Sequence, residues 1–261
     1  PRLADCLAVV WWPGSEAAQA APLFEQADVV LAYGGNTALR DMQQHVPVTA
    51  RFLPHGHKLS FGMVSTAALT LRRAKTTAAL AALDVARYEQ QGCYSPQMLY
   101  VQRGAQVSPH EFAQSLASEL TALSHKFVRR PLSLEEAASV AAWRESHEFA
   151  MVNSANTQVL GDATQAWAVV YCDAPTPLQP GPLNRCVLVV GVDTLDEVAE
   201  LARAQRDYLQ TVGLAAAPEE LLHLGQCLGQ AGVTRICALG AMTSPEAGWH
   251  HDGRFSLLDL V

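Results

Sequence analysis

The chain has 261 residues, 49% of them hydrophobic, and a formal net charge of −7 at pH 7. This composition is that of a globular protein with one or two domains, and an acidic balance without long runs of one sign argues against a nucleic-acid-binding surface. No segment of the sequence approaches the about 18 consecutive apolar residues of a membrane-spanning helix, so we expect no membrane span.

The first part of the chain alternates short apolar runs with amphipathic segments. Buried strands are predicted where apolar residues run together, at residues 7–12, 29–33 and 48–53. Helices are predicted between them, at 15–26 with Ser15 as cap and at 36–45 with Asn36 or Thr37 as cap. Strands and helices that alternate with short links predict a parallel, doubly wound α/β sheet. Ligands bind beyond the carboxyl ends of such strands, where this chain carries residues 13–14, 34–37 and 54–58.

The rest of the chain continues the mixture of helices and strands. Further helices are predicted at residues 65–88, 109–126, 134–149, 193–206 and 218–231, and further strands at 98–102, 166–171, 187–191 and 235–239. Ser133 and Glu136 form a capping-box pattern at the start of one helix. Residues 173–183 are rich in proline and residues 243–254 are loop-like.

Cys93 lies in a polar Gly-Cys turn between a predicted helix and a predicted strand. A thiol held at the edge of a rigid scaffold is typical of a functional cysteine. The alternative is a small buried hydrophobe, because free cysteine is among the most buried residue types. The polar and turn-forming neighbours of Cys93 favour the functional interpretation.

The other cysteines and histidines give weaker signals. The six cysteines are scattered, and none forms a Cys-x-x-Cys pair or a zinc-ligand spacing with histidine, which favours a reducing cytoplasm over a disulfide framework. His250, His251 and Asp252 adjoin on a predicted loop and suggest a metal or a base. Two neighbouring imidazoles do not easily point at one ion, and no third ligand is close in sequence, so we expect no metal there.

Three segments of the chain, taken together, resemble the long-chain fatty-acyl-CoA reductases of the LuxC type. They read ADVVLAYGG at 27–35, GHKLSFG at 56–62 and QQGCYSPQ at 90–97. GVTRIC at 232–237 and WHHDG at 249–253 are similar to the end of that family. The resemblance implies an α/β, aldehyde-dehydrogenase-like fold with a Rossmann-like cofactor domain and an α/β catalytic domain. Family members are longer ahead of the cysteine, so it also implies that an N-terminal part of the cofactor domain is missing.

The resemblance further implies domains and residue roles. Residues 1–87 would be the C-terminal part of the nicotinamide-cofactor domain, 88–242 the catalytic domain and 243–261 a tail. Gly34, Gly35, Asn36 and Thr37 would occupy the cofactor turn, which would take NADPH or NADH. Cys93 would be the nucleophile in the reduction of a long-chain fatty acyl-CoA or acyl-protein thioester to the fatty aldehyde, through an acyl-cysteine intermediate.

The segment 54–58 suggests the base. Hydrolytic aldehyde dehydrogenases carry a glutamate there, whereas this chain has His55 and His57 and no carboxylate. Either imidazole is a candidate base for the thiol or for departing CoA, and the alternative is a loop histidine bonded to backbone. The missing carboxylate favours the reductase over an aldehyde dehydrogenase acting oxidatively. A third hypothesis is a truncated, non-catalytic subunit. From the resemblance we expect a homo-oligomer and acyl-transferase or synthetase partner subunits.

Overall fold

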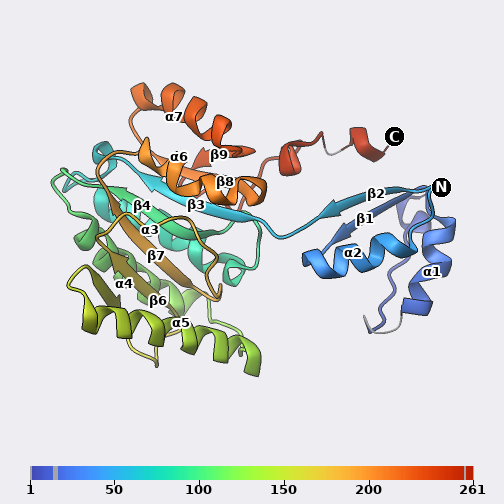
Figure 1. Ribbon diagram of the computed structural model, residues 1–261, viewed down its shortest axis with the longest axis horizontal. Coiled ribbons are helices and arrows are strands. Elements are labelled where there is room, and N and C mark those ends of the chain that lie inside the picture. The colour runs from blue at the N-terminus through green and yellow to red at the C-terminus, as the bar shows by residue number, and fades with distance from the viewer. Residues whose placement is uncertain (1, 14–16, 256, 261) are drawn as a thin grey trace. The chain divides into compact units, whose positions relative to one another are not determined.

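The computed structural model describes residues 2–13, 17–255 and 257–260, and the chain divides into two compact units (Figure 1). The smaller unit is Pro1–His57 with Leu257–Val261, and the larger unit is Lys58–Ser256. The division therefore falls ahead of the expected domain boundary at residue 87. The reason is that residues 59–64 form a strand in the middle of the larger unit's sheet.

The smaller unit pairs two parallel strands and carries two helices. Its strands are β1 (Val29–Tyr33) and β2 (Arg51–His55), and its helices are α1 (Ala17–Gln26) and α2 (Asn36–His45). The predicted strand at 29–33 and the predicted helix at 36–45 are confirmed, and the helix begins after Gly35 as its N-cap. The predicted cap Ser15 lies outside the described residues.

Two strand predictions in this unit need correction. Residues 7–12 form no strand in the described chain, and the Leu7, Val9 and Trp11 side chains are exposed. A strand needs a neighbour for its backbone N–H and C=O groups, and the described sheet of this unit contains only β1 and β2. The strand predicted at 48–53 begins at Arg51, because the Ala50 N–H donates to the Pro47 carbonyl and closes a turn just before it.

The larger unit is built on a seven-stranded sheet with the order β5-β6-β7-β4-β3-β8-β9. All neighbours are parallel except β5, which is antiparallel to β6. The strands are β3 (Leu59–Val64), β4 (Pro96–Gln102), β5 (Thr157–Leu160), β6 (Ala168–Cys172), β7 (Cys186–Val192), β8 (Leu209–Ala215) and β9 (Arg235–Ala238). Sequence patterns predicted β4, β6, β7 and β9 and missed the other three.

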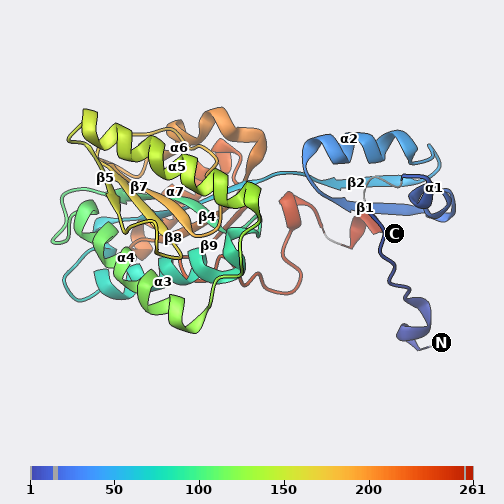
Figure 2. The same cartoon turned by 90° about the horizontal axis from the view of Figure 1, so that it is seen from below.

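Helices cover both faces of this sheet and make three layers (Figure 2). The helices α3 (Ala74–Ala86) and α4 (Pro109–Lys126) cover one face; α5 (Leu134–Asn153), α6 (Glu197–Ala202) and α7 (Pro218–Ala231) cover the other. Phe61 and Met63 of β3 point into one core and Val64 into the other, as the two-residue period of a strand requires. Within the described chain, none of the helices combines the length and apolar character needed to cross a membrane.

Helix boundaries follow local hydrogen bonds. The capping box is confirmed, since the Glu136 N–H donates to the Ser133 hydroxyl at 3.1 Å. The helix predicted at 65–88 is broken, because a turn at 70–73 precedes α3 and left-handed backbone at Tyr88 follows it. Short 3-10 turns complete the chain: η1 (Leu3–Cys6), η2 (Thr66–Ala68), η3 (Arg87–Gln90), η4 (Arg203–Tyr208), η5 (His251–Gly253) and η6 (Leu258–Leu260).

Candidate active site

Cys93 lies in a tight turn between η3 and β4 in the larger unit. The Ser95 N–H donates to the Gly92 carbonyl at 2.9 Å and closes the turn. The Ser60 hydroxyl donates to the Cys93 carbonyl at 2.7 Å, and the Ser60 Oγ in turn accepts a hydrogen bond from the Thr211 N–H at 3.0 Å. The strand register of β3 shifts at Ser60, a local irregularity of the kind that re-aims side chains beside active sites. These bonds hold the Cys93 backbone against β3 and β8.

A buried ion pair supports this turn from the chain segment just before it. Residues 88–90 and 183–185 both have left-handed backbone, with φ between 53° and 69°, which is uncommon for residues other than glycine. The Asn184 N–H donates to the Glu89 carbonyl at 2.9 Å. The Arg185 guanidinium donates twice to the Glu89 carboxylate, at 2.7 Å each, and Arg185 is only 1% exposed. The two unusual segments therefore stabilise each other and fix the approach to Cys93.

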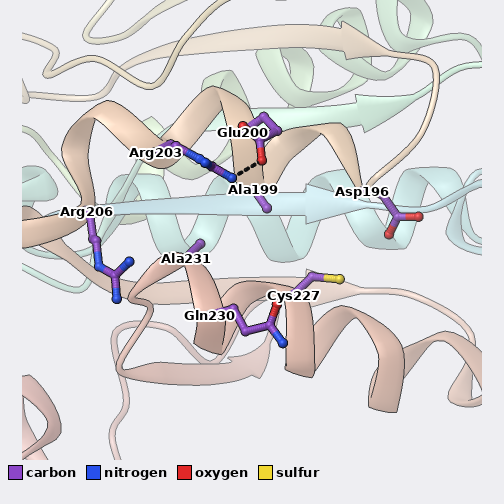
Figure 3. A pocket seen from close by; sticks show the side chains of 8 residues that line it. All are labelled: Asp196, Ala199, Glu200, Arg203, Arg206, Cys227, Gln230 and Ala231. Atoms are coloured by element: carbon purple, nitrogen blue, oxygen red, sulfur yellow. Dashed lines mark hydrogen bonds and ion pairs between the residues drawn. The ribbon is translucent and has the colours of Figure 1, made fainter.

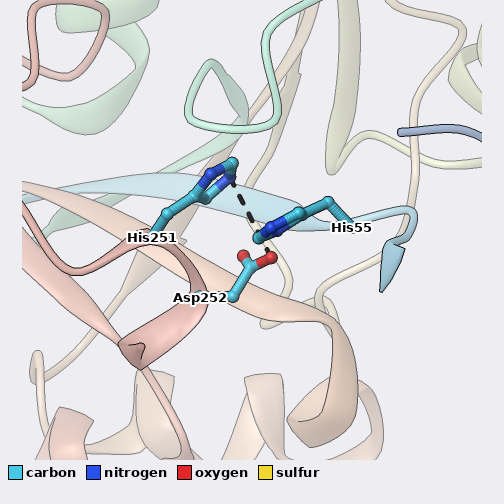
Figure 4. A group of neighbouring side chains, drawn as sticks. All are labelled: His55, His251 and Asp252. Carbon is cyan, nitrogen blue, oxygen red and sulfur yellow. Dashed lines mark ion pairs between the residues drawn. The ribbon is translucent and has the colours of Figure 1, made fainter. Parts of the chain in front are cut away.

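The side chain of Cys93 faces an imidazole, an amide and a carboxylate. Its Sγ lies 3.9 Å from Nε2 of His251. Gln210 of β8 hydrogen-bonds the thiol, and its Nε2 donates to Oδ1 of Asp252 at 2.7 Å. Asp252 Oδ2 lies 3.9 Å from His251 Nε2. Figure 4 shows that His251 and Asp252 come from the same short turn, η5.

The protonation state of the thiol follows from these surroundings. Burial raises the pKa of the Cys93 thiol above its ordinary value. The hydrogen bond with Gln210 acts in the opposite direction, the negative charge of Asp252 raises the pKa further, and the backbone N–H groups of Cys93 and Tyr94 lower it. Because the net shift is upward, the thiol keeps its proton at neutral pH and needs a neighbouring base to become a nucleophile.

The His251 ring is held in place by aromatic packing. The Trp249 ring stacks on it, with centroids 4.8 Å apart and an interplanar angle of 25°. The guanidinium of Arg235, on β9, lies over the Trp249 ring at 5.3 Å and donates to the Met242 carbonyl at 2.8 Å. The two C-terminal motifs of the sequence, at 232–237 and 249–253, therefore meet in the structure, and together they orient the imidazole beside Cys93.

The sequence suggested His55 and His57 as candidate bases. His55 and His57 both belong to the smaller unit, where the His55 ring stacks on Tyr33 at 4.7 Å and His57 is exposed. The imidazole that the structure brings within 3.9 Å of the Cys93 sulfur is that of His251. Sequence reasoning considered His251 only as a weak metal or base candidate and missed Gln210 and Ser60. The only available signal was the position of His251 inside the WHHDG motif.

The glycine turn expected to bind cofactor lies between β1 and α2 of the smaller unit. The Gly34 N–H donates to the His55 carbonyl at 3.2 Å, which places the turn at the carboxyl end of both parallel strands. Gly35 is the N-cap of α2 and has no side chain to satisfy the first helical N–H groups, which begin at Asn36 and Thr37. A Cβ at Gly35 would meet no atom within 4 Å, so the helix start is open to a phosphate. These residues fit a nucleotide.

Similar proteins agree with the sequence motifs. A long-chain acyl-protein thioester reductase of Photorhabdus laumondii subsp. laumondii is 28% identical over 256 residues, which is 98% of this chain and 50% of that protein. The protein of the same name from Vibrio harveyi is 25% identical over 257 residues, again 98% of this chain and 50% of that protein. The chain therefore spans about half the length of the curated relatives it matches.

Solved structures show the fold. An NADP-dependent glyceraldehyde-3-phosphate dehydrogenase from Bacillus halodurans C-125, complexed with NADP, superposes with a TM-score of 0.64 at 17% identity, over 91% of this chain and 51% of that chain. An NAD-dependent aldehyde dehydrogenase from Burkholderia multivorans gives a TM-score of 0.62 at 18% identity, over 88% of this chain and 43% of that chain. The expected aldehyde-dehydrogenase-like α/β fold is confirmed.

The family assignment rests on the whole chain. A family model described as acyl-CoA reductase (LuxC) matches residues 1–261. The residues that build the Cys93 turn and its C-terminal imidazole come from the motifs that suggested this family in the sequence. The chain therefore belongs to the LuxC family of acyl-CoA reductases.

Proposed function

We propose that this chain carries the acyl-accepting centre of a reductase that converts a long-chain fatty acyl thioester to the fatty aldehyde. The observation that carries the proposal is the Cys93 thiol with the His251 imidazole 3.9 Å from its sulfur. The names of the relatives from Photorhabdus and Vibrio support an acyl-protein thioester as substrate, and the family description supports an acyl-CoA. Both donors present the same thioester carbonyl to a nucleophile.

Acylation begins with a proton transfer. The Cys93 thiol gives its proton to Nε2 of His251, and the sulfur then forms a bond to the acyl carbon. The carbon–sulfur bond of the incoming thioester breaks, and the departing thiolate takes the proton from the His251 imidazolium. The backbone N–H groups of Cys93 and Tyr94, which lie beside the sulfur, are the local donors for the oxyanion that forms on the acyl oxygen.

We propose His251 as the base because its Nε2 lies 3.9 Å from the sulfur. Gln210 and Asp252 position it on one side and Trp249 on the other. Because burial raises the pKa of the Cys93 thiol, the resting thiol is protonated and needs a base to take its proton during acylation.

Reduction requires a nicotinamide cofactor, whose phosphates Gly34, Gly35, Asn36 and Thr37 would hold at the start of α2. When bound, the cofactor supplies the hydride that brings the acyl carbon to the oxidation level of an aldehyde. In this half of the reaction Cys93 is the leaving group. The bond between its sulfur and the former acyl carbon breaks, the aldehyde is released, and the Cys93 thiolate takes up a proton that His251 has received from solvent. The dehydrogenase of similar fold that was solved in complex with NADP supports a nicotinamide cofactor. We propose either NADPH or NADH in this role.

The proposal also includes the expected partners. We retain a homo-oligomer and acyl-transferase or synthetase subunits as predictions, together with a cytoplasmic location. The functional division into a cofactor-binding part ahead of residue 88, a catalytic part at 88–242 and a C-terminal tail likewise remains a prediction. In this division the tail supplies His251, so we propose that it belongs to the catalytic machinery.

Aldehyde formation tests the proposal. The chain, and a version extended to the length of its relatives, are incubated with tetradecanoyl-CoA and either NADPH or NADH, and tetradecanal is captured as a hydrazone. We expect aldehyde that depends on Cys93 and is absent in Cys93→Ser. Aldehyde production at an unchanged rate in Cys93→Ser would refute the acyl-cysteine mechanism. Oxidation of tetradecanal with NAD(P)⁺ to the free acid, without formation of aldehyde from the thioester, would favour the oxidative alternative.

A further inference from the structure

Three side chains of the types that bind metal ions lie together on the larger unit, apart from the residues that contact Cys93. A groove of about 310 Å³ runs between the segment of α6 and η4 and the helix α7 (Figure 3). At one end of this groove, Asp196 comes from the N-cap of α6 and Cys227 from α7, and the Cys227 sulfur points toward the Asp196 side (Figure 3). His223, one helical turn before Cys227, completes the group.

The three side chains converge on one point. Nε2 of His223 lies 2.8 Å from Oδ1 of Asp196, and Sγ of Cys227 lies 3.8 Å from the same Nε2. The ligand atoms of all three residues lie within 4.8 Å of one another. His223 and Cys227 are four residues apart on α7, which places them on the same face of the helix. The sequence pattern alone did not single out this histidine–cysteine pair, because its third partner, Asp196, is distant in sequence. The third ligand comes from a different helix, so an ion at this point would join α6 to α7.

The donor set is that of a zinc site. An imidazole nitrogen, a thiolate sulfur and a carboxylate oxygen are the three ligand types that Zn²⁺ takes from proteins, at bond lengths of about 2.0–2.3 Å. In a tetrahedron these bonds place neighbouring ligand atoms about 3.4–3.6 Å apart. The Cys227–His223 separation is already close to this value, and the Asp196–His223 separation needs to open by about 0.6 Å on the same geometry. Both Asp196 and His223 side chains are more than half exposed and can make this adjustment.

The local charge also suits a divalent cation. Coordination removes the proton of Cys227 to solvent, so the site presents two negative charges, one on sulfur and one on Asp196. Two arginines line the same groove, but Arg203 is ion-paired with Glu200 and Arg206 lies at the opposite end from Asp196 (Figure 3). We propose that Asp196, His223 and Cys227 bind one Zn²⁺ ion, with water in the fourth position, and that the ion pins α6 to α7.

Cobalt titration tests the proposal, because Co²⁺ replaces Zn²⁺ and reports a thiolate ligand through a near-ultraviolet charge-transfer band. The titration is run on the Cys93→Ser chain, so that the thiol beside His251 cannot contribute. We expect a charge-transfer band that saturates at one Co²⁺ per chain and disappears when Zn²⁺ is added. Cys227→Ser should abolish the band, and His223→Ala should weaken Co²⁺ binding by at least about tenfold, the smallest loss seen even for outer-shell partners.

Controls separate this site from adventitious binding. Cys172→Ser removes another half-buried thiol, which contacts Thr176 and the Ala174 carbonyl, and should leave the titration unchanged. Added Zn²⁺ should raise the unfolding temperature of the Cys93→Ser chain but not that of the Cys93→Ser, Cys227→Ser double variant. A band that persists in the double variant, or a chain that shows neither a band nor a zinc-dependent unfolding temperature, would overturn the proposal. Since the proposal does not depend on the reductase activity, either result leaves the function proposed for Cys93 untouched.

Discussion

The ion pair between Glu89 and Arg185 should be among the most sensitive points of the larger unit. The pair is buried, with Arg185 at 1% and the Glu89 side chain at 15% exposure, and two 2.7 Å bonds join the groups. Nη1 of Arg185 already has no hydrogen-bond partner in the described chain. Glu89→Gln keeps the size of the side chain but removes the charge that compensates the guanidinium.

The expected loss follows from burial. Removing one partner of a buried ion pair leaves an uncompensated charge and costs about 3–5 kcal/mol. We expect the lower end of this range for Glu89→Gln, because the amide oxygen still accepts one bond and the backbone bond from Asn184 to Glu89 remains. The matched control is Glu200→Gln. Its ion pair with Arg203 has both side chains more than 60% exposed, and we expect a loss below about 1 kcal/mol.

Urea unfolding measures both variants. Replacing Trp11 and Trp12 by phenylalanine confines the tryptophan signal to the larger unit, which contains the other three tryptophans. The free energy of unfolding is extrapolated to water from the linear dependence on urea. If Glu89→Gln lowers the free energy of unfolding by no more than Glu200→Gln does, the prediction is contradicted, because burial would then not increase the contribution of an ion pair to stability. Faster alkylation of Cys93 in folded Glu89→Gln would show that the pair also holds the turn.

Three further changes test the electrostatics and packing of the larger unit. Burial raises the pKa of Asp84 from 3.8 to about 6, so the folded chain binds this proton more tightly and stability falls as pH rises through that window, by about 3 kcal/mol in all. Urea unfolding at pH 4 and pH 7 should show this decrease in the free energy of unfolding. Asp84→Asn should remove the part of the decrease that comes from the Asp84 carboxyl. Gly62→Ala should cost about 1–3 kcal/mol in the same unfolding assay, because the new Cβ would lie 2.4 Å from Leu99 Cδ2 inside the core. Asp252→Asn should lower the pH midpoint of Cys93 alkylation by iodoacetamide, because the Asp252 charge raises the thiol pKa.

Each of these predictions has an outcome that contradicts it. An unchanged pH dependence in Asp84→Asn would mean that the carboxyl is not responsible for it. For the glycine, Gly229→Ala is the control: its Cβ would meet no atom within 4 Å in a helix, and we expect a gain of up to about 1 kcal/mol. Equal effects of the two glycine substitutions would contradict the packing argument. A wild-type alkylation midpoint below the about 8.5 of a free cysteine would contradict the upward shift of the Cys93 pKa.

Local chemistry explains which parts of the molecule could be predicted. The turn that carries Cys93 could be predicted because the residues that form it are adjacent in sequence. The helices α4 and α7 could be predicted because their apolar residues recur at a regular helical spacing. The strand β3 was missed because Ser60 and Gly62 interrupt its apolar pattern. Both interruptions have a structural cause: Ser60 donates to the Cys93 carbonyl, and Gly62 leaves room for a leucine from the next strand. Polar or small residues inside a strand therefore weaken the apolar pattern from which a strand is predicted. In β3 such residues have structural roles, and that of Ser60 is at the Cys93 site.

The position of His251 beside Cys93 could not be predicted, for a different reason. His251 is 158 residues from Cys93 in sequence, and only the packing of η5 against β8 brings the two together. Gln210, the link between them, lies in β8, a strand that carries two buried polar residues at its start and was also missed. By contrast, His55 and His57 were chosen as candidates because they stand in the segment where hydrolytic aldehyde dehydrogenases carry a glutamate.

Acylation of Cys93 in a single turnover is the most direct test of the proposed acyl-cysteine mechanism. The chain and its extended version are mixed with tetradecanoyl-CoA without cofactor, and intact mass and peptide mapping follow the acyl group over time, with His57→Ala as the comparison for His251→Ala. We expect a hydroxylamine-sensitive acyl group on Cys93, formed much more slowly in His251→Ala and at the normal rate in His57→Ala. Acylation that is unaffected in His251→Ala but slowed in His57→Ala would contradict the role of His251. An acyl group on another residue would contradict the role of Cys93.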